Sequence, residues 1–172
     1  MAEHPGYALI LSGAILFFVG LLQGVGIPYF KNSRMALSGH LTAVQCAMAL
    51  MIFGLMWSHI GQALGHALSV TAQLSLIVGF LLIWIGITAA SINGASKTLP
   101  IAGAGFSGSK AAESLVTVVE VIGSLLAVIG GGLVVWGADR NFKGHLQSLR
   151  MWVPGGRSCK KQTKPAQLAG QN

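Results

Sequence analysis

The fold follows from stretches such as residues 34–57, which read RMALSGHLTAVQCAMALMIFGLMW. After Arg34 this stretch has no further Lys, Arg, Asp or Glu, and it is long enough to cross a bilayer as a helix, which takes about 20 apolar residues. Three other stretches have the same length and apolar character. We therefore predict four membrane-spanning helices, at residues 7–27, 36–57, 68–91 and 111–136.

The composition of the whole chain supports a membrane protein. Of the 172 residues, 53% are hydrophobic and 9% are charged, whereas soluble domains carry about 25% charged residues. We predict an all-α fold, an integral membrane four-helix bundle with a basic C-terminal tail. The four-span domain is expected over residues 1–140, and an amphipathic and disordered tail over residues 141–172.

The net charge of +7 belongs mainly to the tail, because seven of the 11 Lys and Arg residues lie from Arg140 onward. This distribution is typical of a chain that meets anionic membrane lipid, and we expect no nucleic-acid partner. Four spans place both termini on one side of the membrane. The seven basic residues there, against four on the other side, predict that both termini lie in the cytoplasm.

Two connections and two cysteines complete the outline. Residues 31–35 form a short link, so the first two helices are expected to be antiparallel neighbours. Residues 93–110 read NGASKTLPIAGAGFSGSK, which is too irregular to face lipid and is expected to cap one end of the bundle. Cys46 and Cys159 have no metal-ligand spacing and are expected to be unpaired.

His40 is the ionisable group that needs an explanation, because it lies inside an apolar helix. Such a residue is a functional-site candidate by default; the alternative is a histidine whose polar edge reaches the lipid headgroups. On a helix, His40 shares its face with small residues, which accept either another helix or a flat ligand. They are Ala36, Ala43, Ala47 and Gly54. No second metal ligand lies three or four residues after His40, so this helix alone predicts no metal site.

Polar stripes mark two further helix faces. In the fourth helix, a stripe of polar and small residues contains two carboxylates. It consists of Glu113, Thr117, Glu120, Ser124, Ala127 and Gly131. An exposed carboxylate at the depth of Glu120 would cost about 2.5–3.5 kcal/mol, so we expect it to face protein, water or a partner. It is either a structural hydrogen-bonding group or a proton donor or acceptor in a pocket. In the second helix, Ser38, Thr42, Gln45 and Ala49 form a comparable stripe.

Two stretches resemble a known family. Residues 34–44, RMALSGHLTAV, resemble the second-helix signature of the hydroxylaminobenzene mutases, a small four-span membrane family. Residues 99–116, LPIAGAGFSGSKAAESLV, are similar to the segment that leads to a glutamate in the fourth helix, matched here by Glu113. The resemblance covers residues 7–140. These mutases are in turn similar to the styrene oxide isomerases, which are trimers with a haem b between subunits.

The resemblance implies roles for particular residues. In the isomerases the second-helix histidine ligates the iron, which implies His40 as the haem ligand here, with its alanine face toward a neighbouring subunit. The stripe of Ser38, Thr42 and Gln45 would then face its own bundle, beside Glu120. We predict Glu120, Thr42 and Glu113 as catalytic residues. Ferric iron acts in that family as a Lewis acid on the substrate oxygen.

The chain also departs from the mutase pattern. The mutases carry a glutamate and an asparagine two and six positions after the histidine, where this chain has Thr42 and Cys46. Their third helix carries a Tyr-x-Asn near its end, where this chain reads GITAAS, with Ala90 in the matching run. The framework and the histidine are kept, whereas these polar groups are not.

Two functions from different classes follow. The first is a membrane isomerase of the mutase type, haem-dependent and homo-oligomeric, acting on a small apolar substrate. The second is a non-catalytic four-helix scaffold that kept the fold and lost the pocket. A transporter or channel is less favoured, because the sequence has neither a ring of charges nor a pair of broken helices.

Overall fold

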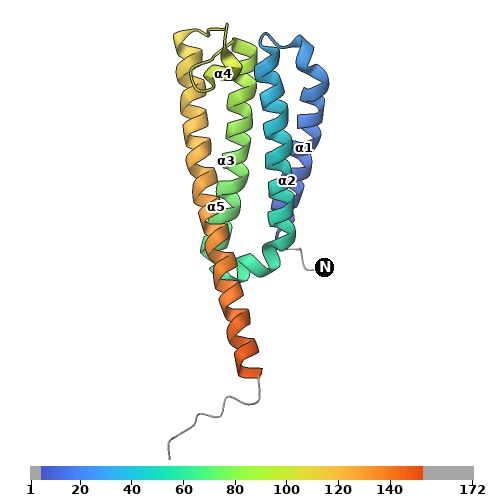
Figure 1. The fold of residues 1–172 in the computed structure, drawn as a ribbon, viewed down its shortest axis with the longest axis vertical. Helices are drawn as coiled ribbons and strands as arrows, with labels where there is room; N and C mark the ends of the chain where they lie inside the picture. Colours follow the sequence, from blue (N-terminus) through green and yellow to red (C-terminus); the bar gives the residue numbers. More distant parts are fainter. Residues whose placement is uncertain (1–4, 153–172) are drawn as a thin grey trace, which may run out of the picture.

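The computed structural model describes residues 5–152, with side chains up to residue 146. The described chain is helical and contains no strand. Four long helices, each apolar enough to cross a membrane, run the length of the bundle in Figure 1. The elements are α1 (Tyr7–Gly26), η1 (Ile27–Tyr29), α2 (Ser33–Leu64), α3 (His66–Asn93), α4 (Pro100–Gly103) and α5 (Lys110–Trp152). The prediction of an all-α bundle with four apolar spans is confirmed.

Glycines bring α1 and α2 into close contact, as antiparallel neighbours (Figure 1). A Cβ added at Gly13 would lie 2.8 Å from the carbonyl oxygen of Ala47, and one added at Gly20 would lie 2.7 Å from Cβ of Ala43. Small residues permit this approach. In a membrane the lipid is as apolar as the side chains, so van der Waals packing between the helices takes the place of the hydrophobic effect. The link between the helices is as short as predicted.

The second antiparallel pair, α3 and α5, is built in the same way. A Cβ at Gly79 would lie 2.7 Å from the backbone nitrogen of Ala127, and one at Gly123 would lie 3.0 Å from the carbonyl oxygen of Gly79. Gly130 meets Leu76 of α3 in the same manner. Gly123, Gly130 and Gly137 repeat every seven residues, the period of a left-handed helix pair. The close packing of both helix pairs, α1 with α2 and α3 with α5, therefore depends on glycines.

The second and third helices are longer than their apolar runs. We expected α2 to end at Trp57, but it continues to Leu64, and α3 follows after one residue, Gly65, at φ 78°. The reason is packing, because Ile60 and Leu64 are buried in the core although Ser58, His59 and Gln62 interrupt the apolar run. Gly65 adopts a left-handed φ that an L side chain would strain.

The segment between α3 and α5 closes one end of the bundle, as expected. It contains the single turn of α4 and lies at the ends of α3 and α5 in Figure 1. The Asn32 side chain donates a hydrogen bond to the Ala102 carbonyl oxygen (3.0 Å), and Arg34 donates one to that of Ala104 (2.6 Å). These bonds attach the segment to the start of α2.

The fourth long helix does not stop at the bilayer boundary predicted from hydropathy. α5 continues through residue 140 without a break to Trp152 and projects below the bundle in Figure 1. Residues 153–172 of the predicted amphipathic and disordered tail, Cys159 included, lie outside the described residues. Cys46 is a free thiol, as expected.

Candidate functional site

The imidazole of His40 lies across the seam between α1 and α2. Its Nδ1 is 2.8 Å from the carbonyl oxygen of Gly20, and the ring packs against Gly24, where an added Cβ would come within 2.8 Å of Cε1 and Nδ1. A carbonyl oxygen only accepts, so Nδ1 is the donor and carries the hydrogen. In the neutral ring Nε2 then keeps its lone pair, the state in which histidine binds a metal.

The small residues beside His40 serve a different purpose from the one expected. Ala36, Ala43 and Ala47 are fully buried, and at least the last two lie against glycines of α1. The alanine face therefore accepts a helix of the same chain. The expectation that it faces a neighbouring subunit is wrong, because the glycines of α1 allow that helix to fill it.

The ring itself lies on the outer side of the seam. Gln23 of α1 faces α3, whereas the next residue, Gly24, points about 100° away and meets His40. The ring is half-buried, and its α2 neighbours Leu37 and Leu41 are 45% and 50% exposed. His40 is thus fixed by protein on one side and open to the surroundings of the bundle on the other.

A buried glutamine, which the sequence analysis missed, connects three helices near this seam. Gln23 is 6% exposed, and its Oε1 accepts a hydrogen bond from the Trp84 indole nitrogen (2.7 Å) and one from the Thr88 hydroxyl (3.4 Å). Its Nε2 donates to the Ala36 carbonyl oxygen (3.3 Å). A lone Gln inside an apolar span was the available signal, since such a group needs partners.

Glu120 lies elsewhere, on the α3 side of α5. Its side chain rests on Gly86, where an added Cβ would lie 2.6 Å from Cγ of Glu120. Oε1 is buried and has no hydrogen-bond partner. The carboxyl borders a pocket of about 340 Å³ with Thr98 and Ser124. A buried carboxyl oxygen without a partner, in a residue that borders a cavity, marks a candidate for a functional site.

The two predicted polar stripes do not meet as expected. Gln45 is exposed, and no hydrogen bond joins Thr42 to Glu120 in the described chain. Thr42 is half-buried and lies about 160° around α2 from His40, because two residues span 200° of a helix. The arrangement of Ser38, Thr42 and Gln45 beside Glu120 is wrong, because Glu120 packs against α3.

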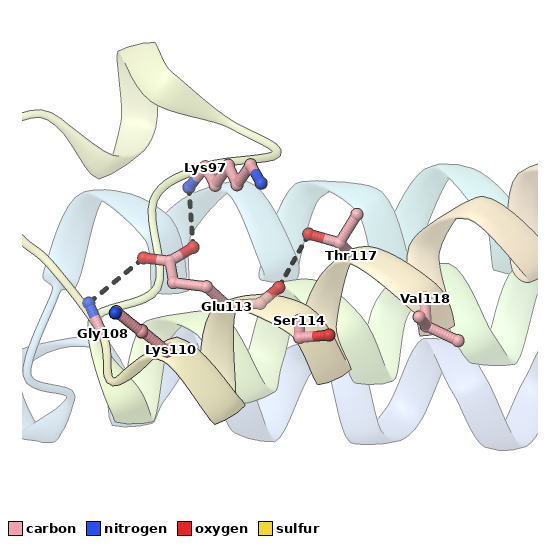
Figure 2. A pocket seen from close by; sticks show the side chains of 7 residues that line it. All are labelled: Lys97, Gly108, Lys110, Glu113, Ser114, Thr117 and Val118. Atoms are coloured by element: carbon pink, nitrogen blue, oxygen red, sulfur yellow. Dashed lines mark hydrogen bonds between the residues drawn. The ribbon is translucent and has the colours of Figure 1, made fainter.

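Glu113 holds the connecting segment in place. Its Oε1 accepts hydrogen bonds from the backbone nitrogens of Ser96 (3.0 Å) and Gly108 (3.2 Å), and its Oε2 accepts one from that of Lys97 (3.0 Å). Figure 2 shows the carboxylate between Gly108 and Lys97, at the edge of a pocket of about 420 Å³. With three such bonds, the carboxylate orders the loop, whereas its predicted catalytic role stays a prediction.

The two stretches that carry the family resemblance come together in space. The start of α2 and the segment around α4 border a groove of about 500 Å³. Its lining residues are Arg34, Leu37, Ser38, Leu99, Pro100, Ile101 and Ala102. Within the described residues, no three His, Cys, Asp or Glu side chains form a cluster able to hold a metal ion.

A comparison with known families decides the relationship. The model of the styrene oxide isomerase family matches residues 6–138. The chain belongs to the styrene oxide isomerase family. Two curated relatives come from Ectopseudomonas oleovorans. Hydroxylaminobenzene mutase HabB is 33% identical over 130 residues, 75% of this chain and 78% of the relative. Hydroxylaminobenzene mutase HabA is 34% identical over 110 residues, 63% of this chain and 80% of the relative. No solved structure matches the chain.

Membership of the styrene oxide isomerase family selects between the function classes. The family and both relatives carry the names of isomerases or mutases, so the chain is an isomerase-type enzyme. Its four long apolar helices agree with an integral membrane protein. The family match contains His40, Glu120 and both resembling stretches, and it ends at residue 138.

Proposed function

We propose that this chain catalyses an intramolecular, mutase-type rearrangement of a small apolar aryl substrate within the membrane, with a haem b held by His40. Its family is named after an epoxide of an aryl alkene, and its relatives after an aryl hydroxylamine. Both are small aryl compounds with a weak or strained bond to oxygen. Such molecules partition into lipid and reach a site between helices directly.

The contacts of His40 fit a haem ligand. Metal-binding histidines almost always donate their other ring nitrogen to a carbonyl or carboxylate, which fixes the tautomer and the ring plane. The Nδ1 bond to Gly20 at 2.8 Å does this, and no residue of the described chain is hydrogen-bonded to Nε2. A haem bound there would supply a Lewis acid that polarises the bond to the substrate oxygen.

Glu120 and Thr98 are the polar groups that we assign to the substrate. Oε1 of Glu120 has no protein partner, and the pocket beside it also has apolar walls, Val121 and Leu125. A small aryl compound fits such a pocket, with its ring against the apolar walls and its polar atom near the carboxyl. Glu120 would hold or accept the proton that moves during the rearrangement. Thr42 is a weaker candidate, because it lies away from both His40 and this pocket.

The proposal includes an assembly of several copies. Because His40 and the Glu120 pocket belong to different helix pairs of one chain, a haem held by His40 would meet the Glu120 pocket of a neighbouring copy. His40 is at the outer side of the α1–α2 seam, so a haem bound to it would extend beyond the chain and need covering by a second copy or by lipid. The family resemblance implies a trimer. Each copy would have both termini in the cytoplasm, where the basic C-terminal end meets anionic lipid.

The single observation that carries this proposal is the hydrogen bond that orients the His40 ring. The test is the absorption spectrum of the full chain, expressed with haem available and purified in mild detergent. We expect a Soret band in the wild-type protein and its loss in His40→Ala. The matched control is His59→Ala, because His59 is exposed near the opposite end of α2 and its removal should leave the band unchanged. A wild-type protein without a Soret band would refute haem binding.

Measurements of turnover distinguish the role of the haem from the role of the Glu120 pocket. With hydroxylaminobenzene or styrene oxide as the substrate, Glu120→Gln should keep the Soret band and lose at least about 10²-fold in rate, the scale of a general acid or base. Wild-type turnover of neither compound would contradict the assigned substrate class. An active Glu120→Gln variant would remove Glu120 from the reaction.

A further inference from the structure

The last part of α5 extends beyond the rest of the bundle. Gly137 packs against Ile60 and Leu64 at the end of α2, and the chain turns into α3 at Gly65. We call residues 138–152 the α5 extension. It is drawn in orange to red in Figure 1, and at 1.5 Å per residue it is about 22 Å long. The family match ends at residue 138, so all but the first residue of the extension lies outside the region shared with the isomerases.

The α5 extension is amphipathic. At 100° per residue, Ala138, Phe142 and Leu146 lie on one side of the helix, together with the polar His145. Of these, Phe142 is 62% exposed and Leu146 is 42% exposed. The two basic residues of the described part lie on other sides of the helix, Arg140 about 160° and Lys143 about 100° from Phe142.

Basic residues together with exposed Phe and Leu side chains on a separate side are typical of helices that lie on a membrane surface. We propose that the α5 extension docks on anionic lipid headgroups next to the bundle. Lys143 forms an ion pair with Asp139 at 2.7 Å, and from Arg140 to the end the sequence contains seven basic and no acidic residues. An anionic surface attracts this charge. A second copy of the extension would repel it, so self-association of the extensions is the less favoured alternative.

The distance of the extension from the bundle places its first residues at the depth of the lipid headgroups. Phe142 lies five residues beyond Gly137, about 7.5 Å along the helix, and each headgroup layer is about 5–8 Å thick. Trp136 is 45% exposed, with the Arg140 guanidinium 5.3 Å from its ring centroid. This is an interfacial pair. The more distant residues, Leu146 among them, reach the surface if the extension bends away from the axis of the bundle.

The test uses the full chain with Cys46→Ala and Cys159→Ala, reconstituted in vesicles, with one added cysteine that carries an environment-sensitive fluorophore. Leu146→Cys reports on the apolar side and Gly144→Cys, about 160° away, is the control. In vesicles that contain phosphatidylglycerol, we expect the label at 146 to be shielded from iodide and quenched by nitroxide lipids, and the label at 144 to remain open to iodide. Shielding should weaken in phosphatidylcholine alone and at about 1 M salt, where the Debye length is about 3 Å.

Charge removal gives a second measurement. Lys143→Gln together with Arg140→Gln should lower the ratio of docked to free extension by about fivefold per residue. Equal iodide access at 146 and 144 in anionic vesicles would overturn the proposal. Shielding at 146 that is independent of lipid charge, but lost when the protein is diluted in lipid, would also overturn it. That result would assign the apolar side to a second copy.

Discussion

At the scale of single residues, the geometry of the site depends on a glycine beside a histidine. A Cβ at Gly24 would lie 2.8 Å from two atoms of the His40 ring. Because the ring ends a rotatable side chain, it can move aside at little cost to folding, but it then loses its hydrogen bond to Gly20. Gly24 is therefore a positioning residue for the proposed haem ligand.

We expect Gly24→Ala to weaken haem retention by about 10–100-fold, the usual loss when the hydrogen bond that orients a metal ligand is removed. The measurement is titration of haem into the purified protein in detergent, followed by the Soret band. Gly26→Ala is the control, because its Cβ would meet only Phe30 at an ordinary 3.5 Å. Equal retention in the two variants would show that the orientation of the ring is not what holds the haem.

The sequence indicated His40 and Glu120 correctly as ionisable groups inside spans, since any such group is costly and therefore conspicuous. It did not indicate their partners. The His40 ring bonds a backbone carbonyl of Gly20, and a carbonyl is present at every position of a chain. Gln23 was visible as a polar residue in α1, but its bonds to Trp84 and Thr88 depend on how α3 is rotated. Glu113 shows the same limit, because the groups that donate hydrogen bonds to its carboxylate are the backbone nitrogens of a folded loop.

At the scale of helices, glycine spacing determines how closely each pair packs. The sequence analysis followed the polar stripe of the fourth helix, whereas the contact face of α5 is the adjacent one, with Gly123, Gly130 and Gly137. Glu120 and Ala127 belong both to the polar stripe and to the face that contacts α3. The stripe therefore predicted correctly that Glu120 faces protein. Helix existence and order were predictable from hydropathy, but the ends of α2 and α5 were not, because both continue beyond the apolar runs.

The packing argument predicts different results for two glycines of one helix pair. At Gly79 an added Cβ would meet the backbone of α5, at 2.7 Å from the nitrogen of Ala127 and 2.9 Å from the carbonyl oxygen of Gly123. A backbone cannot move aside as a side chain can, so Gly79→Ala should destabilise the fold by about 1–3 kcal/mol. Unfolding in mixed micelles with increasing dodecyl sulfate, followed by circular dichroism, measures this change.

The matched control is Gly131→Ala in α5, where an added Cβ has nothing within 4 Å. This substitution should stabilise the helix by up to about 1 kcal/mol, because alanine is a better helix former than glycine. If the two variants unfolded alike, close α3–α5 packing at Gly79 would not be a source of stability.

At the scale of the whole molecule, the two ends of the bundle differ in structure and in charge. One end has the start of α1, the turn at Gly65 and the α5 extension; the other has η1 and the segment around α4 (Figure 1). The latter end is tied together by hydrogen bonds, including Asn32 to Ser91 (3.0 Å) and Lys31 to Asn93 (3.2 Å). Its four basic residues lie close to the helix ends. They are Lys31, Arg34, Lys97 and Lys110.

This asymmetry leads to a prediction of orientation. The end with the α5 extension carries the larger basic charge, and basic segments close to a span are retained in the cytoplasm. In the Cys46→Ala and Cys159→Ala background, Ser107→Cys should react with a membrane-impermeant maleimide on intact cells, because Ser107 is exposed in the segment at the opposite end. Gly144→Cys should react only after the cells are permeabilised. The reverse pattern would place the α5 extension outside the cell. Since the anionic lipid that we propose as its partner is concentrated in the cytoplasmic leaflet, that pattern would also remove the charge complementarity on which its docking depends.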